Sequence, residues 1–414
     1  MQFTTHFRPI SSAIAIFVFV VARLGVLLAF YLFTDGKELA SDVVFHRMII
    51  DDPFGILNGT AKYIASYPPF QWVFEYPLFN LFSIYFGDML SYRLMMLTIE
   101  LLTFITLLIC LHKNGVGERW WLLIVGLYIL APHQIFTTIF FVQEDIIGQL
   151  FILLAFLMLS TQRKLAAMLV LLVGVLAAKL YLIVPLFYVA LFFGRRHLFV
   201  QASHFALALI PIVLIYYLTI SNAISNGGHI PIVDFTPDAV YAANYWVVLL
   251  KAFPEKLDLF KYTSVLLTLV LQLVLTAVFY FYSKKGHTIN AAVLLVLPLA
   301  LFFATFYQQM PEYLLLIWPL IAFISRSVIY QLLVAAAMSF AWTPRVLHGI
   351  MNLKNKSGTS AEERAEIINP TIHSLSDLAG ALHTPALIAN TIVYSAVLIT
   401  LLLLFFRSIN YKRL

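Results

Sequence analysis

Runs of about twenty apolar residues recur along this 414-residue chain, and a water-soluble fold could not bury so many. A helix needs about 20 such residues to cross the hydrocarbon core of a bilayer. Only 11% of the residues are charged, against about 25% in soluble domains. We therefore expect an all-α, polytopic membrane protein. Its longest apolar runs are residues 10–33, 89–111, 199–220, 263–282, 289–306, 328–342 and 388–406.

Basic residues predict the topology, because Lys and Arg in short loops resist translocation. Short basic connections lie at residues 113–119, 163–164, 195–196, 284–285 and 326 and in the tail at 407–413. Placing these connections and the N-terminus on the cytoplasmic side gives a path of about twelve crossings. That side then has thirteen basic residues and one acid, Glu118, whereas the other side has twelve basic residues and eighteen acids.

The segment between residues 163–164 and 195–196 decides the orientation of everything after it. A single tilted helix there would reverse the later topology and move the basic tail outside. We expect instead two short helices that meet near Lys179, each too short to span the membrane fully. Such a break is tolerated at membrane depth only beside protein or a water-filled cavity. Lys179 is thus predicted to mark an outward-facing cavity.

On this path residues 1–414 form one transmembrane domain with three long extracytoplasmic loops, at residues 34–78, 221–261 and 344–384. Loops carry function when a rigid scaffold holds them. Asp42 in the first loop lies just after a span, where a general base could meet a lipid-linked substrate. On composition alone, a solvated or capping role for Asp42 is favoured.

Further candidate residues lie at the starts and breaks of later spans. Glu144 and Asp145 precede a span, where acids also simply complement the helix dipole. Lys179 is the cation best placed to hold a phosphate, although an ion pair that ties helices together explains it equally well. Arg23 within the first span needs a partner or a wet cavity, unless it snorkels. Residues 307–313 open a late span and could line the same cavity.

Several classes of protein are excluded by missing patterns. The eleven His show no metal-ligand spacing such as H-E-x-x-H, and Cys110 is the only cysteine, so no zinc or iron–sulfur site is expected. The sequence contains no GxxxxGK[ST], GxGxxG or G-x-S-x-G motif. A nucleotide-driven pump is therefore not expected, and the energy for any reaction must come with the substrate. The split of charge between the two sides argues against a nucleic-acid-binding face.

Short motifs, taken in their order, resemble those of the GT-C glycosyltransferases. They are Arg23-Leu24, Asp42, Glu75-Tyr76-Pro77-Leu78, Gln143-Glu144-Asp145, Lys179-Leu180-Tyr181 and Pro311-Glu312-Tyr313-Leu314-Leu315. The chain is most similar to polyprenyl-phosphate-mannose-dependent mannosyltransferases, including the catalytic subunit of the first GPI mannosyltransferase, over residues 1–200. It departs from that subunit at Val44, where a second acid would stand, and at Glu312, which replaces a Gln.

This resemblance implies a GT-C-like fold with a long first extracytoplasmic loop, and an inverting hexosyltransferase in a bacterial inner membrane or endoplasmic reticulum membrane. A sugar such as mannose would pass from a polyprenyl or dolichyl phosphate to a glycan or glycolipid acceptor on the periplasmic or lumenal side. Asp42 would be the general base, and Lys179, His46 and Arg93 would bind the donor phosphate. The pocket would be lined by Glu75, Tyr76, Gln143, Glu144, Asp145, Gln309, Glu312 and Tyr313. No cofactor is implied; a divalent cation stays open but has no support in the sequence.

Two other classes remain as alternatives. A multi-pass transporter or a flippase of lipid-linked glycans would also have scattered charges within its spans. Transporters usually show repeats between their halves, and no similarity between the halves is evident here. A polymerase or ligase of lipid-linked glycans would have large outer loops, but it would also be expected to use outer arginines, of which this chain has few.

Overall fold

The computed structural model describes residues 9–34, 43–60, 68–193, 198–226, 252–306, 311–343 and 370–410, with isolated positions at 246, 249 and 346–347. Within these ranges the chain is helical and no strand occurs. Asp42 and Gln309 lie outside the described residues. Glu312 and Tyr313 are described only as backbone in a 3-10 helix, Pro311–Leu316. The expected all-α fold is confirmed for the described part of the chain.

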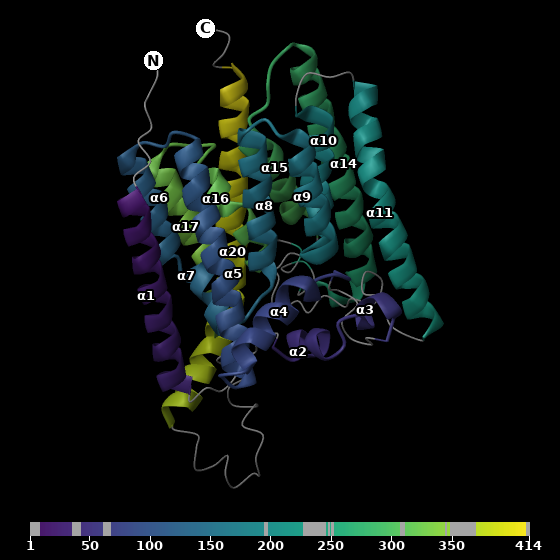
Figure 1. Cartoon of the computed structure of the whole chain (residues 1–414). Coiled ribbons are helices and arrows are strands. Elements are labelled where there is room, and N and C mark those ends of the chain that lie inside the picture. The colour runs from purple at the N-terminus through teal and green to yellow at the C-terminus, as the bar shows by residue number, and fades with distance from the viewer. Residues whose placement is uncertain are drawn as a thin grey trace.

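The helices form a bundle in which most axes run between two ends (Figure 1). The longest are α1 (Pro9–Thr34), α5 (Asp88–Lys113), α11 (Leu198–Ser225), α14 (Leu257–Lys284) and α20 (Pro370–Asn410). The shorter ones are α6 (Glu118–Leu130), α7 (Pro132–Ile135), α8 (Asp145–Ser160), α9 (Lys164–Ala177), α10 (Ile183–Phe192), α15 (Ala291–Thr305), α16 (Trp318–Ile321) and α17 (Val328–Ala341). Three further helices, α2 (Val43–Asp51), α3 (Gly55–Asn58) and α4 (Trp72–Ser83), lie across the end opposite the two termini (Figure 1).

Five described helices are long and apolar enough to cross a membrane, at Ile10–Leu32, Asp88–Lys113, Val200–Ser225, Asp258–Lys284 and Pro385–Leu404. A sixth span results if α6 and the segment Pro132–Phe140, which meet at a bend of 41°, are taken together. The remaining apolar helices have 10–17 residues. The chain is therefore a helical membrane protein with several candidate spans, and these lengths do not confirm the predicted total of about twelve.

Burial separates the central span from the peripheral ones. The most apolar window of α5 is 67% buried, against 17% for α11 and 22% for α14. Since the exposed positions on α11 and α14 are mostly large apolar side chains, their outer faces are suited to lipid. α5 packs against α8, which packs against α9. This central layer holds the polar residues described below.

The predicted break near Lys179 is confirmed. α9 ends at Ala177, a 3-10 turn covers Leu180–Leu182, and α10 begins at Ile183. α9 and α10 pack together as a hairpin, because Lys164 Nζ at the start of α9 donates a hydrogen bond of 2.6 Å to Ala190 O near the end of α10. The two short helices therefore return to the same end of the bundle, with Lys179 at the tip.

The basic connections in the described ranges meet at one end of the bundle, which we call the basic end. Residues from the connections α5–α6, α8–α9, α14–α15 and α16–α17, together with the end of α10, line a single cavity there. α1 begins and α20 ends at the same end (Figure 1). We call the opposite end, where α2–α4 and Lys179 lie, the acidic end.

α3 is fixed to α11 by a close backbone contact at Gly59. Gly59 has φ +70°, and a Cβ there would lie 2.3 Å from the Asn222 carbonyl carbon. The Asn222 Nδ2 atom donates to Leu57 O at 2.8 Å and completes the contact. The segment 55–60 is thus anchored on a helix that lies more than 160 positions away in sequence.

We expect Gly59→Ala to destabilise the protein by about 1–3 kcal/mol, because the new methyl group meets backbone and the left-handed φ disfavours it. Gly87→Ala is the matched control, since a Cβ at Gly87 would meet nothing within 4 Å. Thermal unfolding in detergent should show a lower midpoint for Gly59→Ala only. Equal midpoints would show that α11 does not hold the segment around Gly59 rigidly.

Candidate functional site

The start of α8 and the tip of the α9–α10 hairpin bring one cation and two acids together at the acidic end. Lys179 Nζ forms a hydrogen-bonded ion pair with Glu144 Oε1 and lies 3.4 Å from Asp145 Oδ1. Tyr181 Oη donates a hydrogen bond of 2.7 Å to the same Asp145 oxygen. Two of the predicted motifs, 143–145 and 179–181, therefore form one cluster, which we call the Lys179 cluster: Lys179, Tyr181, Glu144 and Asp145.

Local backbone geometry aims these side chains at one another. Lys179 is extended, with φ −154° and ψ 131°, so its side chain leaves the hairpin tip sideways. Glu144 is the N-cap residue of α8, yet its side chain makes no capping hydrogen bond. The carboxylate faces Lys179 instead, although the helix dipole still favours a negative charge at this position. Capping alone therefore does not explain Glu144.

A second buried pair lies beside this cluster. His46 on α2 contacts Glu75 Oε1 on α4 through Nδ1 at 2.9 Å, and Val142 O through Nε2 at 2.8 Å. Because both ring nitrogens face acceptors, the imidazolium form, which donates from both nitrogens, fits this geometry. Gln71 Nε2 adds a hydrogen bond of 2.6 Å to the same Glu75 oxygen. α2 and α4 are thereby joined to the residues that precede α8.

Val142 adopts an unusual backbone conformation at this junction. Its φ is +51°, a region that β-branched residues rarely occupy, and the side chain is fully buried. Residues held in this way cost about 1–3 kcal/mol and concentrate at functional sites. The conformation presents Val142 O to His46 and directs Glu144 toward Lys179. The strain thus lies next to the Lys179 cluster, two residues before Glu144.

Burial and charge determine how the cluster can act. The side chains of Glu144 and Asp145 are 3% and 0% exposed, whereas Lys179 keeps 14% of its surface. Burial opposes ionisation of Glu144, but the Lys179 and His46 charges and the Lys179 hydrogen bond hold the pKa of Glu144 below its usual value. An ionised carboxylate therefore keeps Lys179 charged and positioned. Lys179 is the member that an incoming anion can reach.

The other predicted residues fall into four groups. Gln143 is buried beside the cluster, and its backbone N–H donates to Thr137 O at 2.8 Å. Arg93 is buried elsewhere on α5, where it donates to Ile139 O at 2.9 Å and lies 4.6 Å from the Phe30 ring centroid. Tyr76 is 41% exposed. The side chains of Asp42, Gln309, Glu312 and Tyr313 lie outside the described residues.

The late 3-10 helix Pro311–Leu316 nevertheless reaches this site. A Cβ on Gly148 would lie 3.2 Å from Leu316 and 3.7 Å from Lys179 Cγ. Leu316 and Lys179 therefore both pack against α8 at Gly148. Gln149 Nε2 donates to Leu315 O at 2.6 Å. The end of this 3-10 helix, at Leu315 and Leu316, therefore lies near the Lys179 cluster. Gln71 and the Val142 carbonyl were missed by sequence reasoning; only the i, i+4 spacing of Gln71 and Glu75 hinted at the former.

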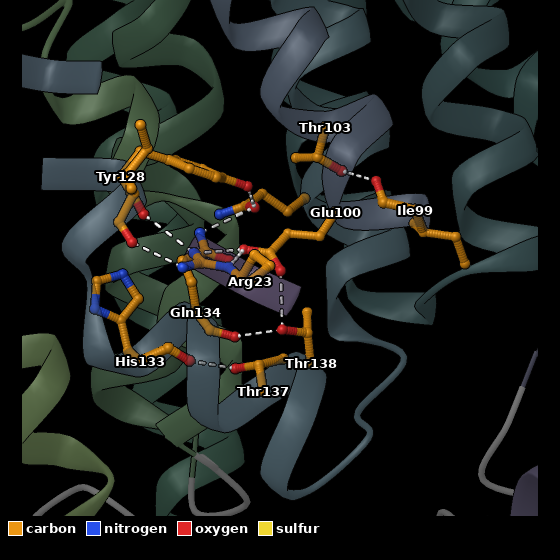
Figure 2. Close-up of polar contacts among 11 residues, drawn as sticks. Arg23, Ile99, Glu100, Thr103, Tyr128, His133, Gln134, Thr137 and Thr138 are labelled. Carbon is orange, nitrogen blue, oxygen red and sulfur yellow. Dashed lines mark hydrogen bonds and ion pairs between the residues drawn. The ribbon is translucent and has the colours of Figure 1, made fainter. Parts of the chain in front are cut away.

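Arg23 belongs to a separate polar network inside the bundle (Figure 2). Arg23 donates to Glu100 Oε1 through Nε at 2.9 Å and through Nη2 at 2.7 Å, and Thr138 Oγ1 donates to the other Glu100 oxygen at 2.9 Å. Arg23 also donates to the carbonyls of Tyr128 and Ile129 at the end of α6. The predicted partner of this intramembrane cation is therefore Glu100.

Comparison with known proteins adds no relative. No family model matches the chain, and no curated protein or solved structure shows significant similarity to it. The fold and the two buried polar groups define a multi-pass α-helical membrane protein with an ion-pair cluster at the acidic end.

Proposed function

We propose that this protein is a GT-C-type membrane glycosyltransferase that uses a polyprenyl- or dolichyl-phosphate sugar as donor. The observation that supports it best is the Lys179 cluster, in which the motif segments 143–145 and 179–181 meet beside the His46–Glu75 pair of the first outer segment. A partly accessible ammonium among buried carboxylates suits a single phosphate group at the end of a lipid chain.

The chemistry balances without a nucleotide or a cofactor. An acceptor hydroxyl oxygen attacks the anomeric carbon, the bond from that carbon to the phosphate oxygen breaks, and polyprenyl phosphate leaves with the electron pair. Asp42 takes the hydroxyl proton, and Lys179 stabilises the charge that develops on the phosphate. Attack opposite the leaving group inverts the anomeric configuration.

The Lys179 cluster and the His46–Glu75 pair beside it also offer acceptors for the sugar. Among the described residues, Glu75 Oε2 and Glu144 Oε2 are buried and have no hydrogen-bond partner. A carboxylate oxygen in that position can accept from a sugar hydroxyl, which distinguishes a sugar phosphate from a bare lipid phosphate. The hexose, with mannose as the leading candidate, is thus held between α4 and α8, and Asp145 and Tyr181 orient Lys179.

We further propose that the acidic end is extracytoplasmic and that the chain crosses the membrane about twelve times. On this count α8, α15, the 311–325 segment and α17 each cross once as short helices, and the α9–α10 hairpin contributes two short crossings. The long loops at 34–78, 221–261 and 344–384 then share the periplasmic or lumenal side with the site. The acceptor is a glycan or glycolipid at that surface.

The test is turnover by purified protein in liposomes with a panel of polyprenyl-phosphate sugars and short glycolipid acceptors, scored by release of polyprenyl phosphate. We expect turnover with at least one donor, and a loss of roughly a hundredfold in Asp42→Asn because the general base is removed. Asp51→Asn is the control, since Asp51 is an exposed acid that pairs only loosely with Arg47 at 3.7 Å. Equal turnover in the wild type and Asp42→Asn would remove Asp42 as base.

A flippase of lipid-linked glycans is the second candidate, and the broken α6–α7 span favours it. Discontinuous helices beside buried charges are common at transporter sites. The same liposomes decide between the two. Movement of a fluorescent polyprenyl-phosphate sugar between leaflets, with no transfer to any acceptor, would replace the enzyme by a flippase. Elongation of the acceptor by repeated lipid-linked units would indicate a polymerase.

A further inference from the structure

The basic end contains a cavity of about 520 Å³ that has no part in the proposed sugar transfer. It lies at the far end of α8, a helix of 16 residues and so roughly 24 Å long, from the Lys179 cluster. The volume falls within the range of about 300–1,000 Å³ that is usual for small-molecule sites. Five chain segments far apart in sequence build its wall, so the cavity is a product of the whole bundle.

The lining combines an apolar floor with a polar rim. Trp120, Phe156 and Phe323 contribute aromatic rings, and Phe156 and Phe323 contact each other with centroids 4.6 Å apart. The rim is supplied mainly by amide, hydroxyl and imidazole side chains, such as those of Gln162 and His287. Arg326 is the one charged lining residue within the described ranges; it is exposed and forms no ion pair with a described residue. A guanidinium without an acidic partner among the described residues, in a cavity lined by aromatic rings, favours an anion attached to an apolar or planar group.

The charges around the cavity are also mainly positive. Further basic residues are exposed on or next to the connections that form the rim, namely Lys113, Arg119, Arg163, Lys284 and Lys285. α15 starts at the cavity wall, where Asn290 Oδ1 caps it by accepting from Ala292 N at 2.8 Å, and α6 starts there at Gly117 without a side-chain cap. Helix N-termini present N–H groups and positive dipole ends, to which phosphate binds readily. Glu118 is the only acid in the sequence of these connections.

We propose that this cavity is a second binding site, which takes a phosphate-bearing ligand with Arg326 as its principal cation. Arg presents a fork of N–H donors that matches two phosphate oxygens at once. The phosphate group comes either from the headgroup of an anionic lipid in the adjacent leaflet or from a soluble phosphate compound. The two sources share the chemistry at Arg326 and differ in whether the aromatic floor is covered by an acyl chain.

The test measures thermal midpoints of the full-length protein in two series. In neutral detergent, sodium phosphate is titrated against sodium chloride at equal ionic strength. In phosphatidylcholine nanodiscs, a rising fraction of phosphatidic acid is incorporated. Arg326→Gln is compared with Arg163→Gln, which removes an exposed charge from the same end but outside the cavity lining. Because both residues are exposed, neither change is expected to prevent folding.

We expect at least one probe to raise the midpoint of the wild type and of Arg163→Gln. Its apparent affinity should fall roughly tenfold in Arg326→Gln, as for loss of a charge-assisted hydrogen bond. A shift with phosphatidic acid alone assigns the site to a lipid headgroup, and a shift with inorganic phosphate assigns it to a soluble ligand. Absence of any shift in the midpoint would overturn the proposal, because neither probe would then bind. Equal losses of affinity in Arg326→Gln and Arg163→Gln would also overturn it, because the effect would then come from net charge.

Discussion

Replacing Lys179 by Gln is expected to lower turnover with the preferred donor by about 10²- to 10³-fold, as for loss of one preorganised donor at a developing oxyanion. The same change leaves Glu144 and Asp145 buried without their common cation, so stability should also fall, by about 3–5 kcal/mol. Lys285→Gln, an exposed cation at the basic end, is the control for general charge effects. It should leave both turnover and stability unchanged.

A double-mutant cycle separates catalysis from a purely structural ion pair. Glu144→Gln removes the charge that pairs with Lys179 while keeping the shape of the side chain. In that background, Lys179→Gln should cost less stability than it does in the wild type, because only the buried Asp145 carboxylate then loses its cation. It should still cost about 10²-fold in turnover if the ammonium acts on the phosphate. No further loss of turnover would mean that Lys179 only ties α8 to the α9–α10 hairpin.

The sequence predicted this cluster better than it predicted the rest of the site, and the reason is local. The 30 residues between two basic connections had to cross the membrane twice or reverse every later span, so a break near Lys179 followed from charge alone. The structure has the break, with α9 and α10 joined by the Lys164 to Ala190 hydrogen bond. Basic connections are a strong signal for topology, because placing two of them on the same side of the membrane requires an even number of crossings between them.

Contacts between distant segments could not be predicted in the same way. His46 meets Val142 across 96 positions, and Val142 takes a backbone conformation that its β-branched side chain disfavours. Propensity predicts an ordinary extended or helical residue there, so tertiary packing decides the outcome. The role of Arg93 at the donor phosphate stays a prediction. Its described contacts are with the 136–140 π-helix, the α5 backbone and aromatic rings of α1.

The Arg23–Glu100 pair shows how far the sequence could predict the surroundings of Arg23. For a cation inside the first span, insertion energetics predicted a partner or a wet cavity, unless the side chain snorkels. The sequence could not show that Arg23 lies beside Pro132. Proline has no N–H, and in a continuous helix the N–H at position 132 would bond to Tyr128 O. Arg23 donates to Tyr128 O at 3.3 Å and to Ile129 O at 2.7 Å, at the 41° break between α6 and α7. The guanidinium thus replaces donors that the broken helix lacks and places a positive charge at a helix C-terminus.

Arg23→Leu is therefore expected to destabilise the protein by about 3–5 kcal/mol, because Glu100 becomes a buried charge without its partner. Glu100→Leu should destabilise the protein by a comparable amount, because Arg23 then becomes the buried charge without its partner. The double variant Arg23→Leu/Glu100→Leu should recover part of the loss, since neither charge is then left alone. It should stay about 1–3 kcal/mol below the wild type, because the Tyr128 and Ile129 carbonyls still lose their donor.

Denaturant unfolding in mixed micelles measures all four members of this cycle, with Arg47→Leu as control. Arg47 and Asp51 are 63% and 69% exposed, so their pair should contribute less than about 1 kcal/mol. Full recovery in the double variant would show that Arg23 serves only to neutralise Glu100 and that the bend at Pro132 needs no donor. A single Arg23→Leu variant as stable as Arg47→Leu would contradict both roles and return Arg23 to a lipid-facing position.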